Sequence, residues 1–537
     1  MKQEICKHPF RSGQHWKARI LSAALLLTAC GRPAPPPDGI TLSLPTSPAT
    51  LDPRTASDAW GERVGALMYE GLLRRNAQGQ LENALALSLV VSSPTRLTIT
   101  LRDSVFFHDG SQLDAADVKA TYEDIQRPER RSIKRGALRG LAQVEIKDPL
   151  TLELSLHEPS ASFLEALTTG IVPSEYAGSS SLPPGTGPYQ LAPDTDEQGP
   201  RLRAFERHWQ GAPRSKWLQF RVLPDATVRA LELLHGGVDL VQGDLPPYLL
   251  DYLCQQPSLH CQSRPALMTR YFTFNLRDPI LQDLRVRKAL VMGLNRAEIQ
   301  QYKLRGRVLP ACSLLPPPNL AHVPDLPCLP FDPTQADVLL REAGFPPHAD
   351  GRPRLHLTYK TSQDELGNAL ARIFQAQWKK LGVALEIRTF EWGIFFNDIK
   401  RGNYQIYALT GVGMNDPDYL AFLLHSKRMP PDGANRARLS LPTLDALLDA
   451  GQQTFDLAQR KAHYREAEML AASQVVYVPL WYEQSTAVMR RSLHGYQVSA
   501  AGDFSGIVHA ERLPTEPESD DDRSTPLPSP GHAGARP

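Results

Sequence analysis

Residues 97–125, LTITLRDSVFFHDGSQLDAADVKATYEDI, predict a strand, a turn and a helix in immediate succession. Apolar and polar residues alternate from Leu97 to Arg102, the pattern of a half-buried strand. Gly110 lies in the polar turn that follows and can adopt the positive φ that tight turns often need. Asp114 stands three residues before Asp117, a spacing typical of a helix N-cap followed by an acidic first turn.

The composition of the 537-residue chain is that of a soluble globular protein with two or three lobes: the net charge is +1, and 42% of the residues are hydrophobic. It gives no reason to expect nucleic acid as a partner, and we interpret the basic run 127–139 as a solvated helix face or loop. Helical and strand patterns alternate, which predicts an α/β fold. The main predicted helices are 283–295, 332–344, 363–381, 444–455 and 458–472, and the main strands are 217–222, 271–275, 383–388 and 475–480.

The N-terminus has the pattern of an export signal. Basic residues precede an apolar run, Ile20 to Ala29, which is too short for a permanent membrane span. Residues 27–30, Leu-Thr-Ala-Cys, resemble a bacterial lipobox, so we predict a signal peptide at 1–29 and lipid attachment at Cys30; an ordinary signal peptide cut nearby is the alternative. Residues 30–39 are predicted to form a proline-rich tether, and the polar segment 514–537 a disordered tail.

Four cysteines remain beyond the exported segment, Cys254, Cys261, Cys312 and Cys328. An even number in an oxidising compartment favours disulfides, and the local pairs 254–261 and 312–328 are the simplest of three connectivities. A zinc site is the rival interpretation, but the chain has no C-x-x-C motif.

Catalytic motifs are absent from the sequence: there is no G-x-S-x-G, no H-E-x-x-H and no G-K-[ST]. His108 and Asp109 are adjacent turn residues and cannot close a metal coordination shell, so we expect both to form hydrogen bonds within the turn. We therefore predict no catalysis, no metal and no cofactor. An exported, lipid-anchored hydrolase with dispersed catalytic residues is the alternative.

One long motif resembles a known family. The pattern L-R-x-x-V-x-F-H-D-G-x-x-L-x-A-x-D-V, at 101–118, is similar to the signature of the oligopeptide- and dipeptide-binding proteins of ABC importers, family 5 of the bacterial extracellular solute-binding proteins. Further landmarks are Leu-Asp-Pro at 51–53, Tyr-Glu-Gly-Leu at 69–72, Gly-Thr-Gly-Pro-Tyr at 185–189 and Glu-Trp at 391–392. The resemblance covers nearly all of residues 40–510.

The resemblance implies a three-lobed periplasmic-binding-protein fold of type II, with mixed sheets and a hinge between its two main lobes. Lobe I would comprise residues 40–60, 185–270 and 481–513, lobe II residues 61–184, and lobe III residues 271–480. The chain would cross between lobes I and III near 270–275 and 480–485. A solute held between these lobes would be delivered to ABC transporter permease subunits by a monomeric receptor that contacts the membrane only through its lipid anchor.

The resemblance also implies which residues contact the solute. They are Ser47, Asn275, Trp392, Thr410, Gly411, Val412, Gly413, Met414 and Asp416. Trp392 either lines the pocket, as the family's tryptophan does, or supports its helix from the core.

Residues 410–418, Thr-Gly-Val-Gly-Met-Asn-Asp-Pro-Asp, depart from the peptide binders. Those proteins carry an aspartate that holds the peptide's ammonium group three residues before the acidic-proline pair, and Gly413 occupies that position here. The place of their aromatic residue falls near Thr410. Asp416 and Asp418 match residues that brace the loop. We therefore expect a solute without a free α-amine, or a different carboxylate that holds the amine.

Overall fold

The structure, a computed structural model, describes residues 38–194 and 198–513. The predicted signal peptide, Cys30, nearly all of the tether and the C-terminal tail lie outside the described residues. Within the described part, no helix combines the length and the apolar character that a membrane crossing requires.

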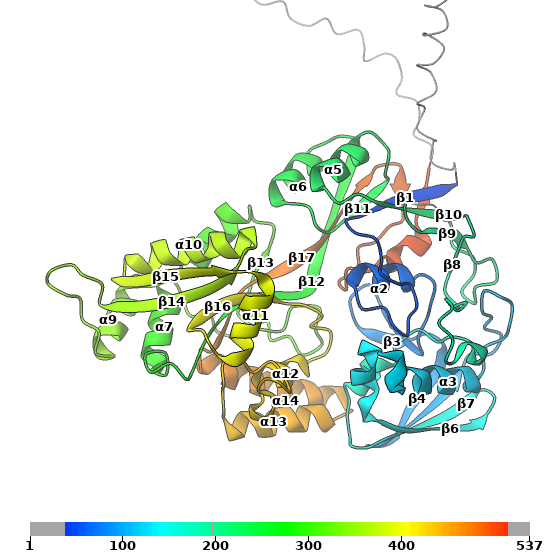
Figure 1. Ribbon diagram of the computed structural model, residues 1–537, viewed down its shortest axis with the longest axis horizontal. Coiled ribbons are helices and arrows are strands. Elements are labelled where there is room, and N and C mark those ends of the chain that lie inside the picture. Colours follow the sequence, from blue (N-terminus) through cyan, green and yellow to red (C-terminus); the bar gives the residue numbers. More distant parts are fainter. Residues whose placement is uncertain (1–37, 195–197, 514–537) are drawn as a thin grey trace, which may run out of the picture.

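A large mixed sheet runs through the molecule and joins its two main lobes (Figure 1). Its strand order is β15-β14-β16-β12-β17-β11-β1-β10-β9-β8, with β13 paired to β17. β1 is parallel to β10 and β11, whereas β12 is antiparallel to β16 and β17. The strands are β1 (Gly39–Leu44), β8 (Tyr189–Leu191), β9 (Arg201–Ala204), β10 (Trp217–Val222), β11 (Leu240–Gln242), β12 (Leu259–Phe274), β13 (Leu309–Pro310), β14 (Leu355–Ser362), β15 (Val383–Phe390), β16 (Ile406–Gly411) and β17 (Tyr477–Arg490).

β12 and β17 carry the chain between lobes I and III, and both are longer than the sequence pattern predicted. The expected strands 271–275 and 475–480 are only the lobe III parts of these elements. The other halves pair with each other in lobe I, where Leu259 lies opposite Arg490. The pairing is interrupted between Pro265 and Thr269, so the ladder is irregular where the chain passes from one lobe to the other.

Lobe II is built around the strand-turn-helix unit. Leu97, Ile99 and Leu101 are buried, as the alternation predicted, and Asp114 forms a capping box with Asp117. The lobe contains a sheet of order β4-β5-β7-β6. Its elements are β4 (Ala86–Ser93), β5 (Arg96–Leu101), α3 (Ala115–Gln126), β6 (Leu141–Asp148), β7 (Thr151–Leu156), α4 (Phe163–Ala166) and 3₁₀ helices at Pro128–Arg130, Ile133–Gly140 and Ser174–Tyr176.

Helices cover both faces of the lobe III sheet, in agreement with the predicted α/β fold. One apolar core lies beneath α7, α9 and α10, and a second beneath α11 to α14. The helices are α7 (Leu284–Met292), α8 (Arg296–Glu298), α9 (Pro333–Glu342), α10 (Glu365–Lys379), α11 (Trp392–Arg401), α12 (Tyr419–Leu424), α13 (Pro442–Gln453) and α14 (Leu457–Ser473), with a π-helical turn at Ile299–Lys303 and a 3₁₀ helix at Ser426–Arg428.

Lobe I has its own core around β1 and β10, and that core includes α2. The predicted boundary at residue 61 therefore falls inside a helix that packs with lobe I, because Val64, Leu67 and Met68 all belong to this core. The remaining elements are α2 (Ala59–Gly65), α5 (Ala226–Leu234), α6 (Pro247–Cys254), a 3₁₀ helix at Ser505–His509, and the small strands β2 (Leu73–Arg75), β3 (Leu81–Asn83), β18 (Leu493–His494) and β19 (Glu511–Arg512).

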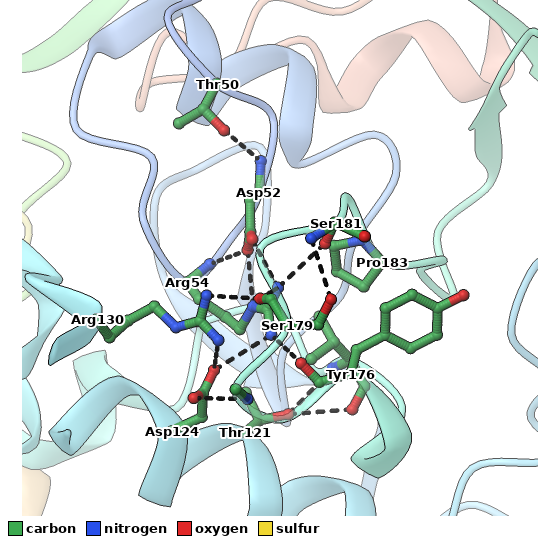
Figure 2. A network of polar contacts seen from close by, with 12 residues as sticks. Thr50, Asp52, Arg54, Thr121, Asp124, Arg130, Tyr176, Ser179, Ser181 and Pro183 are labelled. Atoms are coloured by element: carbon green, nitrogen blue, oxygen red, sulfur yellow. Dashed lines mark hydrogen bonds and ion pairs between the residues drawn. The ribbon is translucent and has the colours of Figure 1, made fainter.

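A buried arginine fastens lobe I to lobe II (Figure 2). Arg54 is fully buried and donates hydrogen bonds to Asp52 at 2.9 and 2.7 Å and to Asp124 of α3 at 3.2 Å. It also donates to the carbonyl oxygen of Tyr176 at 2.7 Å. Because two carboxylates and a carbonyl face the guanidinium, the buried charge is compensated and the junction is held in one geometry.

His108 fixes the Gly-Thr-Gly-Pro-Tyr loop rather than its own turn. Its Nδ1 accepts a hydrogen bond from the amide of Gly185 at 3.2 Å, and its Nε2 lies 2.9 Å from the carbonyl oxygen of Gly187. Burial lowers the pKa of His108 to about 4, so the ring is neutral. The expectation of bonds within the turn holds for Asp109, which accepts from Ser111, and is wrong for His108. The loop passes so close to the chain that a Cβ on Gly185 would lie 2.0 Å from the carbonyl oxygen of Met68.

Candidate functional site

The loop after β16 lies where the chain crosses between the lobes. Gly411, the last residue of β16, pairs with Thr269 of β12. The amide of Met414 then donates to the carbonyl oxygen of Leu267 at 3.1 Å, and the amide of Leu267 donates to Ala500 of lobe I at 3.2 Å. Residues 410–414 are therefore held against the crossing strand by backbone bonds and lie beside a segment of lobe I.

Asp416 and Asp418 brace this loop from within lobe III. Arg460 of α14 donates to Asp416 at 2.9 and 2.6 Å and to Asp418 at 2.8 Å. The hydroxyl of Tyr464 donates to Asp418 as well. Burial and repulsion by Asp418 raise the pKa of Asp416 to about 6, although Arg460 opposes the shift. Both carboxylates are committed to the brace, as the sequence interpretation held, and Asp416 does not point a free carboxylate toward a solute.

Gly413, which the sequence interpretation matched to the ammonium-binding aspartate of the peptide binders, is an open position in the structure. Its φ is +65°, and a Cβ built there would meet no atom within 4 Å. Gly411, in contrast, has no room for a side chain, because a Cβ there would lie 2.1 Å from Cε of Met414. Between the two glycines, the side chain of Val412 is 62% exposed.

Trp392 is half exposed and does not belong to the apolar cores of lobe III, so it does not support its helix from the core. It is the first residue of α11, and Glu391 caps the helix by accepting from the amides of Gly393 and Ile394. Its indole is 53% exposed and stacks on Phe396 with ring centroids 5.4 Å apart. Figure 1 shows α11 on the side of lobe III that faces α2 of lobe I. The exposed residues Trp392 and Ile394 both lie in the first turn of this helix.

Two predicted contact residues have their side chains elsewhere. Asn275 follows the far end of β12, and its amide donates to the carbonyl oxygens of Gly402 and Tyr404 at 2.9 and 2.7 Å. Met414 is fully buried in the lobe III core. We therefore leave both side chains out of the candidate site. Ser47 is exposed in the segment between β1 and α2.

Arg270 and Glu483 are charged residues at the crossing that the motif comparison missed. Arg270 of β12 donates from Nη1 to the hydroxyl of Thr410 at 3.2 Å. Glu483 of β17 accepts from the indole of Trp481 at 2.8 Å, and its pKa is raised by burial. The sequence signal for Arg270 was a charged residue directly before the aromatic-rich strand segment Tyr271–Phe274.

The four cysteines are joined in the predicted pairs. Cys254, at the end of α6, is joined to Cys261 of β12 with Cα atoms 5.6 Å apart. Cys312 is joined to Cys328 with Cα atoms 5.2 Å apart. The first bond attaches α6 to the crossing strand.

A small pocket is lined by both cysteines of the Cys312–Cys328 bond and by none of the predicted contact residues. Glu468 of α14 lines it and is almost fully buried. One of its oxygens accepts hydrogen bonds from Ser313 and from the amides of Leu314 and Leu315, whereas the other has no partner. Burial raises the pKa of Glu468 to about 7.

A family profile and individual relatives both match this chain to extracellular solute-binding proteins. The sequence profile described as "Bacterial extracellular solute-binding proteins, family 5 Middle" matches residues 80–430. The glutathione-binding protein GsiB of Salmonella paratyphi A is 27% identical over 473 residues, which cover 85% of this chain and 91% of that protein. GsiB of Escherichia coli K12 is 25% identical over 500 residues, covering 90% and 96%.

Solved structures share the fold. HbpA2 from Haemophilus parasuis superposes with a TM-score of 0.80 at 22% identity, covering 88% of this chain and 100% of that one. NikZ from Campylobacter jejuni, in complex with Ni(L-His), superposes with a TM-score of 0.72 at 24% identity, covering 89% and 100%. The predicted periplasmic-binding-protein architecture is confirmed by these superpositions.

Proposed function

Because the chain belongs to family 5 of the bacterial extracellular solute-binding proteins, we propose that it is the lipid-anchored receptor of an ABC importer, which captures a small solute between lobes I and III and delivers it to the permease subunits. Proteins of this family are transport binding proteins and not enzymes. The family assignment therefore replaces the alternative of an exported hydrolase.

The observation that carries the proposal is the geometry at the lobe crossing. Two long strands join the lobes, and their pairing is irregular at Pro265–Thr269. Two exposed side chains belong to lobe III: Val412, in the loop held against the crossing strand, and Trp392, at the start of α11. A hinge of two strands permits an equilibrium between open and closed forms, and a solute bound to both lobes shifts it toward the closed form. Closure would also cover these exposed apolar side chains.

The candidate site favours a peptide-like solute that is not held by the usual ammonium clamp. Gly413 has no side chain, and Asp416 and Asp418 are both bonded to Arg460. A buried ammonium group without a carboxylate partner costs several kcal/mol, so ordinary peptides would bind weakly through this loop. The relatives named for glutathione binding make small peptide-like compounds the first class to test.

Native mass spectrometry of the purified protein tests the proposal, because a tightly held solute co-purifies with its receptor. Calorimetry with di- to pentapeptides and their amine-blocked forms then tests the solute class. We expect no loss of binding when the amine is blocked. Tight binding that is lost on blocking the amine, yet survives both Asp416→Asn and Asp418→Asn, would contradict this description of the site.

Small-angle scattering tests the hinge: the radius of gyration should fall when the identified solute saturates the protein. Equal profiles with and without solute would count against closure.

The proposed cellular location is the cell envelope, with lipid at Cys30. Cys30→Ser should abolish acylation and release the protein or leave it unprocessed. A mature N-terminus at another residue, without lipid, would contradict the anchor.

A further inference from the structure

Among the described residues, Arg270 is a buried guanidinium that forms no ion pair, although its charge and that of Glu483 interact at longer range. Its side chain is 8% exposed, and its Nε is buried without a hydrogen-bond partner. Thr410 is its hydrogen-bond partner, and within residues 38–194 and 198–513 no carboxylate forms an ion pair with it. Three other buried arginines are satisfied: Arg54 and Arg460 each contact two carboxylates, and Arg287 donates to four carbonyl groups. The half-buried Arg436 and Arg438 also have an Nε without a hydrogen-bond partner, so it is the deeper burial of Arg270 that sets it apart.

An unpaired buried charge calls for a partner from outside the chain. Desolvation of a guanidinium is costly unless an opposite charge and hydrogen-bond acceptors replace the lost water. Buried donors without acceptors are rare in folded proteins, and each one requires an explanation. An anion that binds after folding would supply both the charge and the acceptors.

Arg270 lies at the lobe crossing beside the candidate loop. In the ladder it is opposite Thr410 on one side and Trp481 on the other. Arg270 donates a hydrogen bond to the hydroxyl of Thr410, and Thr410 is the first residue of the segment 410–414. A solute between lobes I and III would therefore reach the guanidinium from the side of this loop.

Glu483 is the acidic group that Arg270 influences, but it is not its ion-pair partner. Its carboxyl is bonded to the indole of Trp481. Burial raises the pKa of Glu483, and the charge of Arg270 only partly offsets that effect. Because no carboxylate of the described residues lies within ion-pair distance of Arg270, its guanidinium remains available to an anionic group of a solute.

We propose that Arg270 binds an anionic group of the solute, a carboxylate or a similar oxyanion, so that the transported compound is an organic anion or a zwitterion. This inference rests on the proposed receptor function and specifies its substrate class. A guanidinium presents parallel N–H donors that match the two oxygens of a carboxylate. Anchoring through the acidic end of a solute would also explain how the site can work without an aspartate at Gly413.

The test compares Arg270→Gln with Arg388→Gln, a control on edge strand β15 whose guanidinium is half exposed and paired with Glu386. Thermal-shift screening with the wild type would use free amino acids, di- and tripeptides including glutathione, small dicarboxylates, the methyl esters of these compounds, neutral sugars and polyamines. We expect the compounds that raise the melting temperature of the wild type to carry a free carboxylate. Arg270→Gln should weaken their binding at least about tenfold in calorimetry, whereas Arg388→Gln should bind like the wild type.

A second measurement separates binding from folding. Because Arg270 has no ion pair to lose, unliganded Arg270→Gln should melt no lower than the wild type. A large drop in its melting temperature would show a structural role and overturn the proposal. Wild-type binding of an ester or a neutral sugar that Arg270→Gln retains would also overturn it, while leaving the receptor function intact. Absence of any binding by the wild type would instead contradict the receptor function itself.

Discussion

Replacing Arg460 with methionine should destabilise lobe III, and more strongly at neutral than at acidic pH. The guanidinium holds Asp416 and Asp418 together by three hydrogen bonds of 2.6 to 2.9 Å. Methionine has a similar length but no charge, so the substitution leaves two buried carboxylates close together without a cation. Those carboxylates brace the loop that contains Gly413.

The magnitude follows from the burial of the cluster. Removing one partner of a buried ion pair typically costs about 3–5 kcal/mol. For a unit of the size of lobe III this corresponds to a melting temperature lower by roughly 6–20 °C.

The direction of the pH effect follows from Asp416, whose folded pKa of about 6 lies above its ordinary value of 3.8. Because the pKa of Asp416 is raised in the folded state, protonation of this carboxyl favours folding at low pH, and this stabilisation is lost as the pH rises through about 6. Without Arg460 the pKa of Asp416 rises further. The variant should therefore regain part of its stability at about pH 5.

Differential scanning calorimetry at about pH 5 and about pH 7.5 measures both effects. Arg465→Met is the matched control, because Arg465 lies on the same helix but pairs with the exposed Asp325, and exposed pairs contribute at most about 1 kcal/mol. A loss below about 1 kcal/mol at both pH values, equal to that of the control, would refute the assignment of Asp416 and Asp418 to a buried brace.

Three further variants test other parts of the structure. Gly413→Asp should create binding of peptides with a free amine, because the position is open and aspartate tolerates a φ of +65° at a cost of about 1 kcal/mol. Calorimetry measures this binding, and unchanged binding would place the ammonium position elsewhere. Glu468→Gln should stabilise the protein by up to about 3 kcal/mol at about pH 8 and have little effect at about pH 5, because the pKa of Glu468 is raised to about 7 and the wild type loses stability as this carboxyl ionises. An equal loss of stability at both pH values in thermal unfolding would refute this. The double substitution Cys254→Ser and Cys261→Ser should lower the free energy of unfolding by about 2–4 kcal/mol. Non-reducing peptide mapping of the wild type should recover the 254–261 and 312–328 pairs, and four free thiols would contradict them.

The local elements of this chain could be predicted from sequence because neighbouring residues determine them. The alternation at 97–101 and the Asp114 cap depend on periodicity and capping chemistry within a few residues. Helix α9 ends as predicted, because Gly344 takes the positive φ that stops it. The long family motif then indicated the architecture that these elements build.

Only the tertiary structure decided which residues meet. The length of β12 is set by its pairing with β17, more than two hundred residues away, and the polar lobe I half of β12 carries no strand pattern of its own. His108 finds its partners in a loop distant in sequence, and Asn275 turns its amide to Gly402 rather than to a solute. That Arg270 forms no ion pair within the described part of the chain is likewise visible only in three dimensions, because the charges around a buried group come from strands that folding brings together.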